Sequence, residues 1–366
     1  MTTLGIEEEY LLLHPESGLP VFNATEVQAL LETGDSISTE DIQRELLSCQ
    51  IETATPVCET LTEAEESLLN FRRQLSAAAR KSGVRASGSA TAPRIEEGYP
   101  QLTDKQRYYE LKSSAPGIVA DQFVNGLHVH VGVPDKETGV QALNRIRPWL
   151  PIITALSTNS PFWLDRDSGF ASWRTVHYRR WPVQGCPPVF ADAGEYERRI
   201  QRLVDTGVII DRGVLTWVAR LSDHYPTLEV RTADSQLEAQ DSVLIAALVR
   251  GLVTTAVDDA LAGKPYADPD AELLDAAQWQ AARQGLSDVV VNPLSGKLVP
   301  AREQMDRLLE YTGSALDAAG DTNWVLAGLK TVWDRGTGAV RQRRAMHHSG
   351  MTGLLDLYAE TLIAER

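Results

Sequence analysis

Cysteine and long apolar runs are scarce in this sequence. Its three cysteines, Cys49, Cys58 and Cys186, include no CxxC pair. An odd number without such pairs argues against a disulfide scaffold and a structural zinc site, so we expect the reducing cytoplasm. No stretch of about 18 uncharged apolar residues occurs, and residues 1–13 lack the basic segment and apolar run of a signal peptide. We therefore expect neither a membrane span nor a signal peptide.

Several nucleotide-binding and nucleophile motifs are also missing. The chain has no GxxxxGK[ST] and no GxGxxG, so a nucleotide would not be held in a P-loop or Rossmann manner. It has no GxSxG, and nothing singles out a nucleophilic cysteine. Positive charge is in deficit, with 35 lysines and arginines against 50 acidic residues and a net charge of -15. Because such a surface repels phosphate backbones, we expect no nucleic-acid partner.

The length and composition allow a substantial globular fold. The 366 residues are 43% hydrophobic, enough for a large core in one big domain or two modest ones. No repeat and no low-complexity linker divides the chain, so we expect a single catalytic domain over 1–366. Candidate strands are scattered between helices through 1–232, and the last third is helical. That order predicts an α/β (α+β) fold with a helical C-terminal layer.

Hydrophobic periodicity predicts the individual elements. Alternation or short apolar length indicates strands at 4–13, 84–90, 123–133 and 227–232. Helical spacing indicates helices at 60–82, 104–113, 140–159, 238–261, 269–284, 300–311 and onward through 364. The stretch 169–190 is aromatic, cationic and rich in proline and glycine, which favours a structured loop.

Four short segments carry polar groups where half-buried strands usually carry apolar ones. They are GIEEEY, IETATP with Glu52, GLHVHVG and LEVRTAD. Alternate side chains of a strand share a face. This period places three pairs on common faces: Glu7 with Glu9, His128 with His130, and Glu229 with Arg231. Glu8 should point to the opposite face, so we expect Glu8→Gln to be mild and Glu9→Gln to be severe.

This set of residue types is typical of a metal site for phosphoryl transfer. Carboxylates crowded on one face raise one another's pKa, and a divalent cation among them relieves the repulsion. Oxygen ligands with an imidazole suit Mg²⁺ or Mn²⁺ better than zinc. An arginine two residues from a ligand carboxylate can reach a phosphate, whose oxygens match its planar fork. Metal and arginine together are the usual arrangement for phosphoryl transfer.

Each segment alone also has a simpler interpretation. The three consecutive glutamates could form an exposed edge strand, and Glu52 could be a surface residue. His128 and His130 could be buried core histidines or half of a zinc site. Glu229 and Arg231 could belong to a cross-strand ion-pair network. The four segments taken together favour a metal site, and their spacing alone supports no more specific function than metal binding.

Taken in order, the segments GIEEEYLLL, QIETATPV, NGLHVHVGV, WRTVHYRRWP and LEVRTADSQ resemble the type 2 glutamate–cysteine ligase family, which includes YbdK-like carboxylate–amine ligases. The resemblance runs from Leu4 to GTGAVRQRR at 336–344. It implies a glutamine-synthetase-like fold whose curved, mostly antiparallel sheet forms an open cleft. It also implies that ATP phosphorylates a carboxylate to an acyl phosphate, which an amine then attacks to form an amide. Nothing in the sequence identifies a glutamate pocket or a cysteine pocket.

The resemblance also implies roles for individual residues. The implied metal ligands are Glu7, Glu9, Glu45, Glu52, His128 and Glu229. Arg231 would steady the transferred phosphoryl group, and His130 would lie on the nucleotide side. Arg174 and Arg341 are candidates for binding a substrate carboxylate, or are surface arginines. The implied cofactor is Mg²⁺ or Mn²⁺, the co-substrate is ATP, the partners are a small carboxylate and a small amine, and the assembly is a homodimer.

Two other functions fit the same residues. A phosphotransferase of the guanidino-kinase type could use the metal and arginine without forming an amide. A non-catalytic protein could use the site to sense nucleotide or metal.

Overall fold

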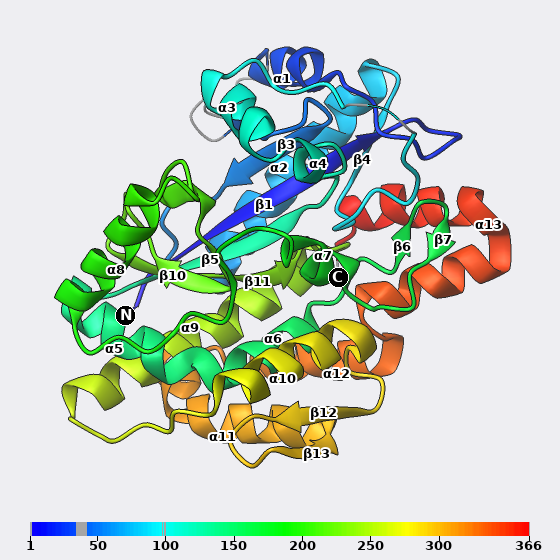
Figure 1. The fold of residues 1–366 in the computed structure, drawn as a ribbon. Helices are drawn as coiled ribbons and strands as arrows, with labels where there is room; N and C mark the ends of the chain where they lie inside the picture. Colours follow the sequence, from blue (N-terminus) through cyan, green and yellow to red (C-terminus); the bar gives the residue numbers. More distant parts are fainter. Residues whose placement is uncertain (1, 34–41, 97, 99, 366) are drawn as a thin grey trace.

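A seven-stranded antiparallel sheet forms the centre of the computed structural model, which describes residues 2–33, 42–96, 98 and 100–365 (Figure 1). The strands run in the order β10-β11-β5-β1-β3-β2, and β4 pairs with β1. Their bounds are β1 (Leu4–Leu13), β2 (Ile42–Arg44), β3 (Gln50–Ala54), β4 (Arg85–Ser87), β5 (Gly126–Gly132), β10 (Ala219–Leu221) and β11 (Thr227–Asp234). The long strand β1 therefore has β5 on one side and β3 on the other.

Helices lie on both sides of this sheet (Figure 1). Those that precede the last third are α1 (Ala24–Glu32), α2 (Leu61–Lys81), α3 (Gln106–Ser114), α4 (Pro116–Val119), α5 (Lys136–Ile146), α6 (Leu150–Leu156), α7 (Trp173–Tyr178) and α8 (Ala193–Asp205). They are followed by α9 (Ala239–Leu261), α10 (Ala271–Gln284), α11 (Ala301–Ala319), α12 (Thr322–Arg335) and α13 (Gly338–Leu362). Helix α9 packs against β1, β5 and β11, while α11 and α12 pack against its other side (Figure 1). Because α9 is enclosed in this way, apolar residues occupy most of its circumference.

The expected fold class is confirmed, as are several individual elements. The helix expected at 60–82 is α2, which begins with a capping box between Thr60 and Glu63. The helix expected at 140–159 is instead broken into α5, a 3-10 turn η2 (Arg147–Trp149) and α6. Pro148 and Pro151 explain the break, because proline has no N–H for the helical hydrogen bond. The loop at 169–190 contains the short helix α7, whose N-cap is Ser172.

The last third is less uniformly helical than expected. Strands β12 (Val289–Asn292) and β13 (Lys297–Pro300) form a hairpin between α10 and α11. Helix α11 continues to Ala319 and ends at Gly320, which adopts the left-handed conformation. The remaining short elements are β6 (Phe162–Trp163), β7 (Arg166–Asp167), β8 (Gln184–Gly185), β9 (Thr216–Trp217) and the 3-10 turn η3 (Arg212–Val214). Within the described part of the chain, no helix has the length and apolarity needed to cross a membrane.

Glu8 faces the helices and not the solvent. Its carboxylate receives two hydrogen bonds from Arg72 of α2, Nη2 to Oε1 at 2.7 Å and Nε to Oε2 at 3.0 Å. The hydroxyls of Tyr10 and Ser242 also donate to it. Glu8 is 1% exposed and Arg72 is fully buried. The expected orientation of Glu8 is therefore confirmed. Because Glu8→Gln would leave a buried guanidinium without its counter-charge, we now expect this substitution to reduce stability.

Candidate active site

The face of the sheet opposite Glu8 forms the floor of a cavity of about 310 Å³. Strands β1, β3, β5 and β11 contribute to this floor, and their register creates cross-strand pairs. The pairs are Glu9 with Glu52, Glu7 with His128, and His130 with Glu229. The predicted site residues that line the cavity are Glu7, Glu9, Glu45, Glu52, His128, His130, Glu229 and Arg231. Four distant segments of the sequence thus meet at one polar surface.

Glu7 lies at the centre of this surface. Its Oε2 is 3.1 Å from His128 Nδ1, and its Oε1 is 3.2 Å from His130 Nε2. Burial raises the pKa of Glu7, but the hydrogen bonds and charges of the two imidazoles outweigh it, so the pKa lies well below its ordinary value. Glu7 belongs to two groups whose potential ligand atoms all lie within 4.8 Å of one another: Glu7, Glu52 and His128, and Glu7, His130 and Glu229.

A second cluster of carboxylates adjoins Glu7. Burial and the negative charge of Glu45 raise the pKa of Glu9 to about 8. Burial, followed by the charge of Glu45, raises the pKa of Glu52 well above its ordinary value. The backbone N–H of Gly126 donates to Glu9 Oε2 at 2.8 Å. Without a cation these carboxylates oppose one another's ionisation, so the cluster has the electrostatics of a cation site.

The donor set fits Mg²⁺ or Mn²⁺. Carboxylate oxygens predominate, and oxygen ligands with at most one or two imidazoles suit these ions. Nε2 of His128 is buried and has no hydrogen-bond partner among the described residues, so it is available as a ligand atom. Burial and the nearby Arg231 lower the pKa of His128 to about 4. His128 is thus neutral near pH 7, which is the form that binds metals.

Arg231 lies in a β-bulge. Val230 pairs with Val129 and Ala233 pairs with Leu127, so both Arg231 and Thr232 lie opposite His128. Nη1 of Arg231 contacts Glu229 and lies 3.3 Å from His128 Nδ1. This guanidinium lies on the cavity face beside the histidines, as the alternation from Glu229 predicts. After Arg231 the bulge reverses the alternation, so that Ala233 lies opposite Leu127, a change that the sequence pattern did not reveal.

Glu229 is held between two arginines. Arg220 of β10 donates from Nε to Glu229 Oε2 at 2.7 Å, and Arg231 contacts the other oxygen. Burial raises the pKa of Glu229, but these two positive charges outweigh it and lower the pKa well below its ordinary value. The carboxylate is therefore ionised at neutral pH. Arg220 was not anticipated from the sequence, where it stands in an unremarkable WVARL segment.

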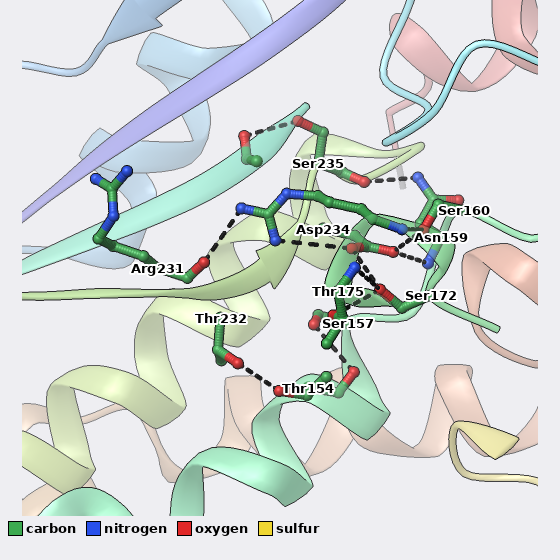
Figure 2. Close-up of polar contacts among 12 residues, drawn as sticks. Thr154, Ser157, Asn159, Ser160, Ser172, Thr175, Arg231, Thr232, Asp234 and Ser235 are labelled. Atoms are coloured by element: carbon green, nitrogen blue, oxygen red, sulfur yellow. Dashed lines mark hydrogen bonds and ion pairs between the residues drawn. The ribbon is translucent and has the colours of Figure 1, made fainter. Parts of the chain in front are cut away.

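Arg174 of α7 contacts the backbone of the bulge. Its Nη2 donates to the backbone oxygen of Arg231 at 3.2 Å, and its Nη1 is 3.8 Å from Asp234 Oδ1. Asp234 in turn accepts hydrogen bonds from Asn159 N, Ser160 Oγ and Ser172 Oγ at 2.7 to 2.8 Å (Figure 2). Arg174 does not line the cavity; its contacts connect α7 to the backbone of Arg231.

Gly126 provides the space that Arg174 occupies. A Cβ atom at this position would lie 2.4 Å from Arg174 Nη2 and 3.0 Å from His128 Nε2. Both distances are too short for a side chain to be accommodated without displacement. The glycine in the NGLHVHVG segment therefore leaves room for the Arg174 guanidinium, which a larger residue would displace.

Arg341 is not brought to the cavity. It belongs to α13, and its guanidinium contacts Glu238 and lies 3.4 Å from Asp241 Oδ2 at the start of α9. Its predicted role in binding a substrate has no support from its position. Conversely, the structure adds aromatic residues to the cavity that the sequence reading had not singled out: Tyr108, Tyr178, Trp181 and Tyr225. Tyr178 and Trp181 lie in the WRTVHYRRWP segment, and the aromatic content of that segment could have indicated that it lines the cavity.

Comparison with known proteins identifies the family of this chain. A family model described as glutamate–cysteine ligase family 2 matches residues 3–359. The chain belongs to this family. A Mycolicibacterium vanbaalenii protein with the provisional name glutamate–cysteine ligase 2-2 is 43% identical over 94% of this chain and 93% of its own length. A Saccharopolyspora erythraea protein with the same provisional name is 40% identical over 95% of this chain and 89% of its own.

Solved structures share the fold of this family member. The glutamate–cysteine ligase of Francisella tularensis, solved with AMP, has a TM-score of 0.73 and 13% identity, covering 100% of this chain and 89% of that one. The bifunctional glutathione synthetase of Pasteurella multocida has a TM-score of 0.67 and 16% identity, covering 98% of this chain and 51% of that one. The expectation of an ATP-dependent carboxylate–amine ligase is thus confirmed at the level of the family.

Proposed function

We propose that this protein uses ATP and Mg²⁺ to join a small carboxylate to a small amine through an acyl phosphate. The observation that carries the proposal is the meeting of carboxylates, imidazoles and Arg231 in one cavity. Glu7, Glu52, His128, His130 and Glu229 would hold the metal, with Glu9 and Glu45 completing the acidic end. When bound, Mg²⁺ would neutralise charge on the phosphate oxygens.

The residues of the chain have distinct tasks in this reaction. A carboxylate oxygen of the acid attacks the γ-phosphorus of ATP, and ADP leaves with the electron pair of the broken bond. Arg231 lies where its guanidinium can neutralise the charge on the transferred phosphoryl group, since that group carries charge on three oxygens. The amine then attacks the acyl carbon, phosphate leaves with the oxygen of the acid, and the amine loses a proton.

Hydroxylamine offers a test that does not require the amine to be known. With ATP, Mg²⁺ and a panel of acids, it should convert the acyl phosphate to a hydroxamate and release phosphate. An acid labelled with ¹⁸O in its carboxylate should transfer one label to that phosphate. A stable phosphorylated product without amine dependence would instead indicate a phosphotransferase, and nucleotide binding without turnover would indicate a sensor.

The homodimer and the cytoplasmic location remain predictions from the sequence. Sedimentation velocity measures the first directly, and a monomer over the working concentration range would contradict it.

A further inference from the structure

A buried carboxylate, Asp234, ends strand β11 three residues after Arg231 and takes no direct part in the proposed reaction. Its oxygens accept hydrogen bonds from the backbone N–H of Asn159 and from the hydroxyls of Ser160 and Ser172 (Figure 2). The carboxylate and these three donors are buried. Each bond that was lost would leave a buried polar group unsatisfied, so Asp234 fixes the positions of its donors.

Asp234 holds helix α7 at two points. Ser172 is the N-cap of α7, and its hydroxyl both donates to Asp234 and caps the first turn of the helix. Further along α7, Arg174 Nη1 lies 3.8 Å from Asp234 Oδ1, and Arg174 Nη2 donates to the backbone oxygen of Arg231 at 3.2 Å. The same guanidinium lies 4.9 Å from the ring centroid of Tyr178, which lines the cavity. Arg174 therefore connects the buried carboxylate to the backbone of Arg231.

The backbone of the bulge is held by further contacts. The N–H of Arg231 donates to the oxygen of Val218 at 2.8 Å, so both the N–H and the oxygen of Arg231 are bound. The hydroxyl of Thr232 contacts the hydroxyl of Thr154 on α6 and accepts from Gln278 Nε2 on α10 at 2.8 Å. With its backbone fixed in this way, Arg231 can change the position of its guanidinium only through its side-chain torsions.

The GTGAVRQRR segment at 336–344 contacts the same network. Gln342 Nε2 donates to the backbone oxygen of Asn159 at 2.7 Å and to its Oδ1 at 2.6 Å, and Gln342 Oε1 accepts from the hydroxyl of Tyr358 at 2.8 Å. A Cβ atom at Gly338 would lie 2.0 Å from Asn159 Oδ1, so α13 approaches Asn159 closely. The segment thus reaches Asp234 through Asn159, although none of its residues lines the cavity.

We propose that Asp234 is a positioning residue for phosphoryl transfer, because it holds Arg174, which in turn holds the backbone of Arg231. The inference rests on the proposed function, in which Arg231 neutralises charge on the transferred phosphoryl group. A displacement of about 1 Å in such a group can lower the rate about a hundredfold. Since Arg231 would act mainly on the transition state, a loss of positioning should lower kcat and leave KM for ATP nearly unchanged.

A second buried aspartate provides a matched control. Asp321 pairs with Arg250 between α12 and α9, and neither residue lines the cavity. Asp234→Asn and Asp321→Asn should both lower Tm, because each leaves a buried guanidinium without its counter-charge. In the hydroxamate assay, well below both Tm values, only Asp234→Asn should lower kcat, by at least tenfold. A kcat for Asp234→Asn equal to that for Asp321→Asn would overturn the proposal.

A further variant keeps this test decisive if Asp234→Asn does not fold. The double variant Asp234→Asn with Arg174→Met leaves neither of the two buried charges unpaired, so it should fold more readily. It should show the same loss of kcat, because the backbone oxygen of Arg231 has lost its donor. A folded double variant with the kcat of the parent protein would contradict the positioning role.

A double-mutant cycle tests whether Asp234 acts through Arg231. With the protein in excess over the limiting acid, so that slow rates are measurable, Asp234→Asn should change the rate less than twofold in an Arg231→Ala background. A loss as large as in the parent background would show that Asp234 acts by another route and would overturn the proposal. The proposed function is tested separately. An Arg231→Ala variant with the parent kcat would refute the role of Arg231, and no hydroxamate from any acid would refute the ligase function.

Discussion

Two neighbouring glutamates should respond in opposite ways to the same substitution. Glu8→Gln removes the charge that balances fully buried Arg72, whereas Glu9→Gln alters the cavity floor. Removing one partner of a buried ion pair costs about 3–5 kcal/mol, because the other charge remains without compensation. The candidate active site lies on the other face of the strand, so Glu8→Gln should keep the activity of the molecules that remain folded.

The expected thermal shift follows from the size of the chain. For 366 residues, an unfolding entropy of about 2.1 cal/mol/K per residue sums to about 0.8 kcal/mol/K. A loss of about 3–5 kcal/mol therefore lowers Tm by about 4–6 °C. Glu9→Gln should instead remove activity without reducing stability. Its carboxyl has a pKa of about 8 without metal, so a neutral amide should leave Tm unchanged near pH 7 while hydroxamate formation is lost.

Circular dichroism melting and the hydroxamate assay at 20 °C would measure both properties on the same preparations. A control that replaces both charges, Glu8→Leu with Arg72→Met, should recover part of the stability, because no buried charge is left unpaired. A Tm for Glu8→Gln within about 1 °C of the parent protein would refute the reasoning from the buried pair. Equal losses of activity in Glu8→Gln and Glu9→Gln would show that the two faces of the strand are not functionally distinct.

Three further results are expected. Arg231→Lys should lower kcat about a hundredfold with little change in KM for ATP, because lysine lacks the planar guanidinium that binds two phosphate oxygens. An unchanged kcat would exclude a role for Arg231 in phosphoryl transfer. The raised pKa of Glu9 means that the metal-free folded protein retains a proton that the unfolded chain loses, so the contribution of Glu9 to stability falls as the pH rises from about 4.5 to about 8. Tm measurements should therefore show that Mg²⁺ stabilises the protein more at pH 8 than at pH 6. The opposite order would contradict the raised pKa of Glu9. Gly126→Ala should lower kcat at least tenfold, because the added Cβ displaces Arg174. In the double variant with Arg174→Ala, Gly126→Ala should add little further loss. Additive losses in the double variant would show that the two residues act separately.

Local alternation was sufficient to predict which side chains share a face. It separated Glu7 and Glu9 from Glu8, because the period of a strand depends only on its own backbone. Glu45 lies outside a regular strand, so only the family resemblance pointed to it. The bulge at Arg231 depends on pairing with β5, which is remote in sequence. The sequence pattern of β11 alone does not indicate a bulge that arises from its pairing with another strand.

Buried charge was the property that sequence patterns predicted least well. Arg72 lies on a helix whose charged residues would ordinarily face solvent, and only the fold reveals that it meets Glu8 and the backbone oxygens of Gln236 and Leu237. The hairpin of β12 and β13 was missed for a different reason. Its strands have four residues each, too few for periodicity to separate them from the ends of neighbouring helices.

The run Glu7-Glu8-Glu9 fixes the register of β1 from both sides of the sheet. A slip by one residue would move Glu7 or Glu9 into the apolar layer and carry Glu8 away from Arg72 into the cavity. Both errors are electrostatically costly, so the strand has one acceptable alignment with β3 and β5. Deleting or inserting a single residue between Gly5 and Tyr10 should therefore abolish folding, although either change leaves the segment as acidic and as apolar as many natural strands.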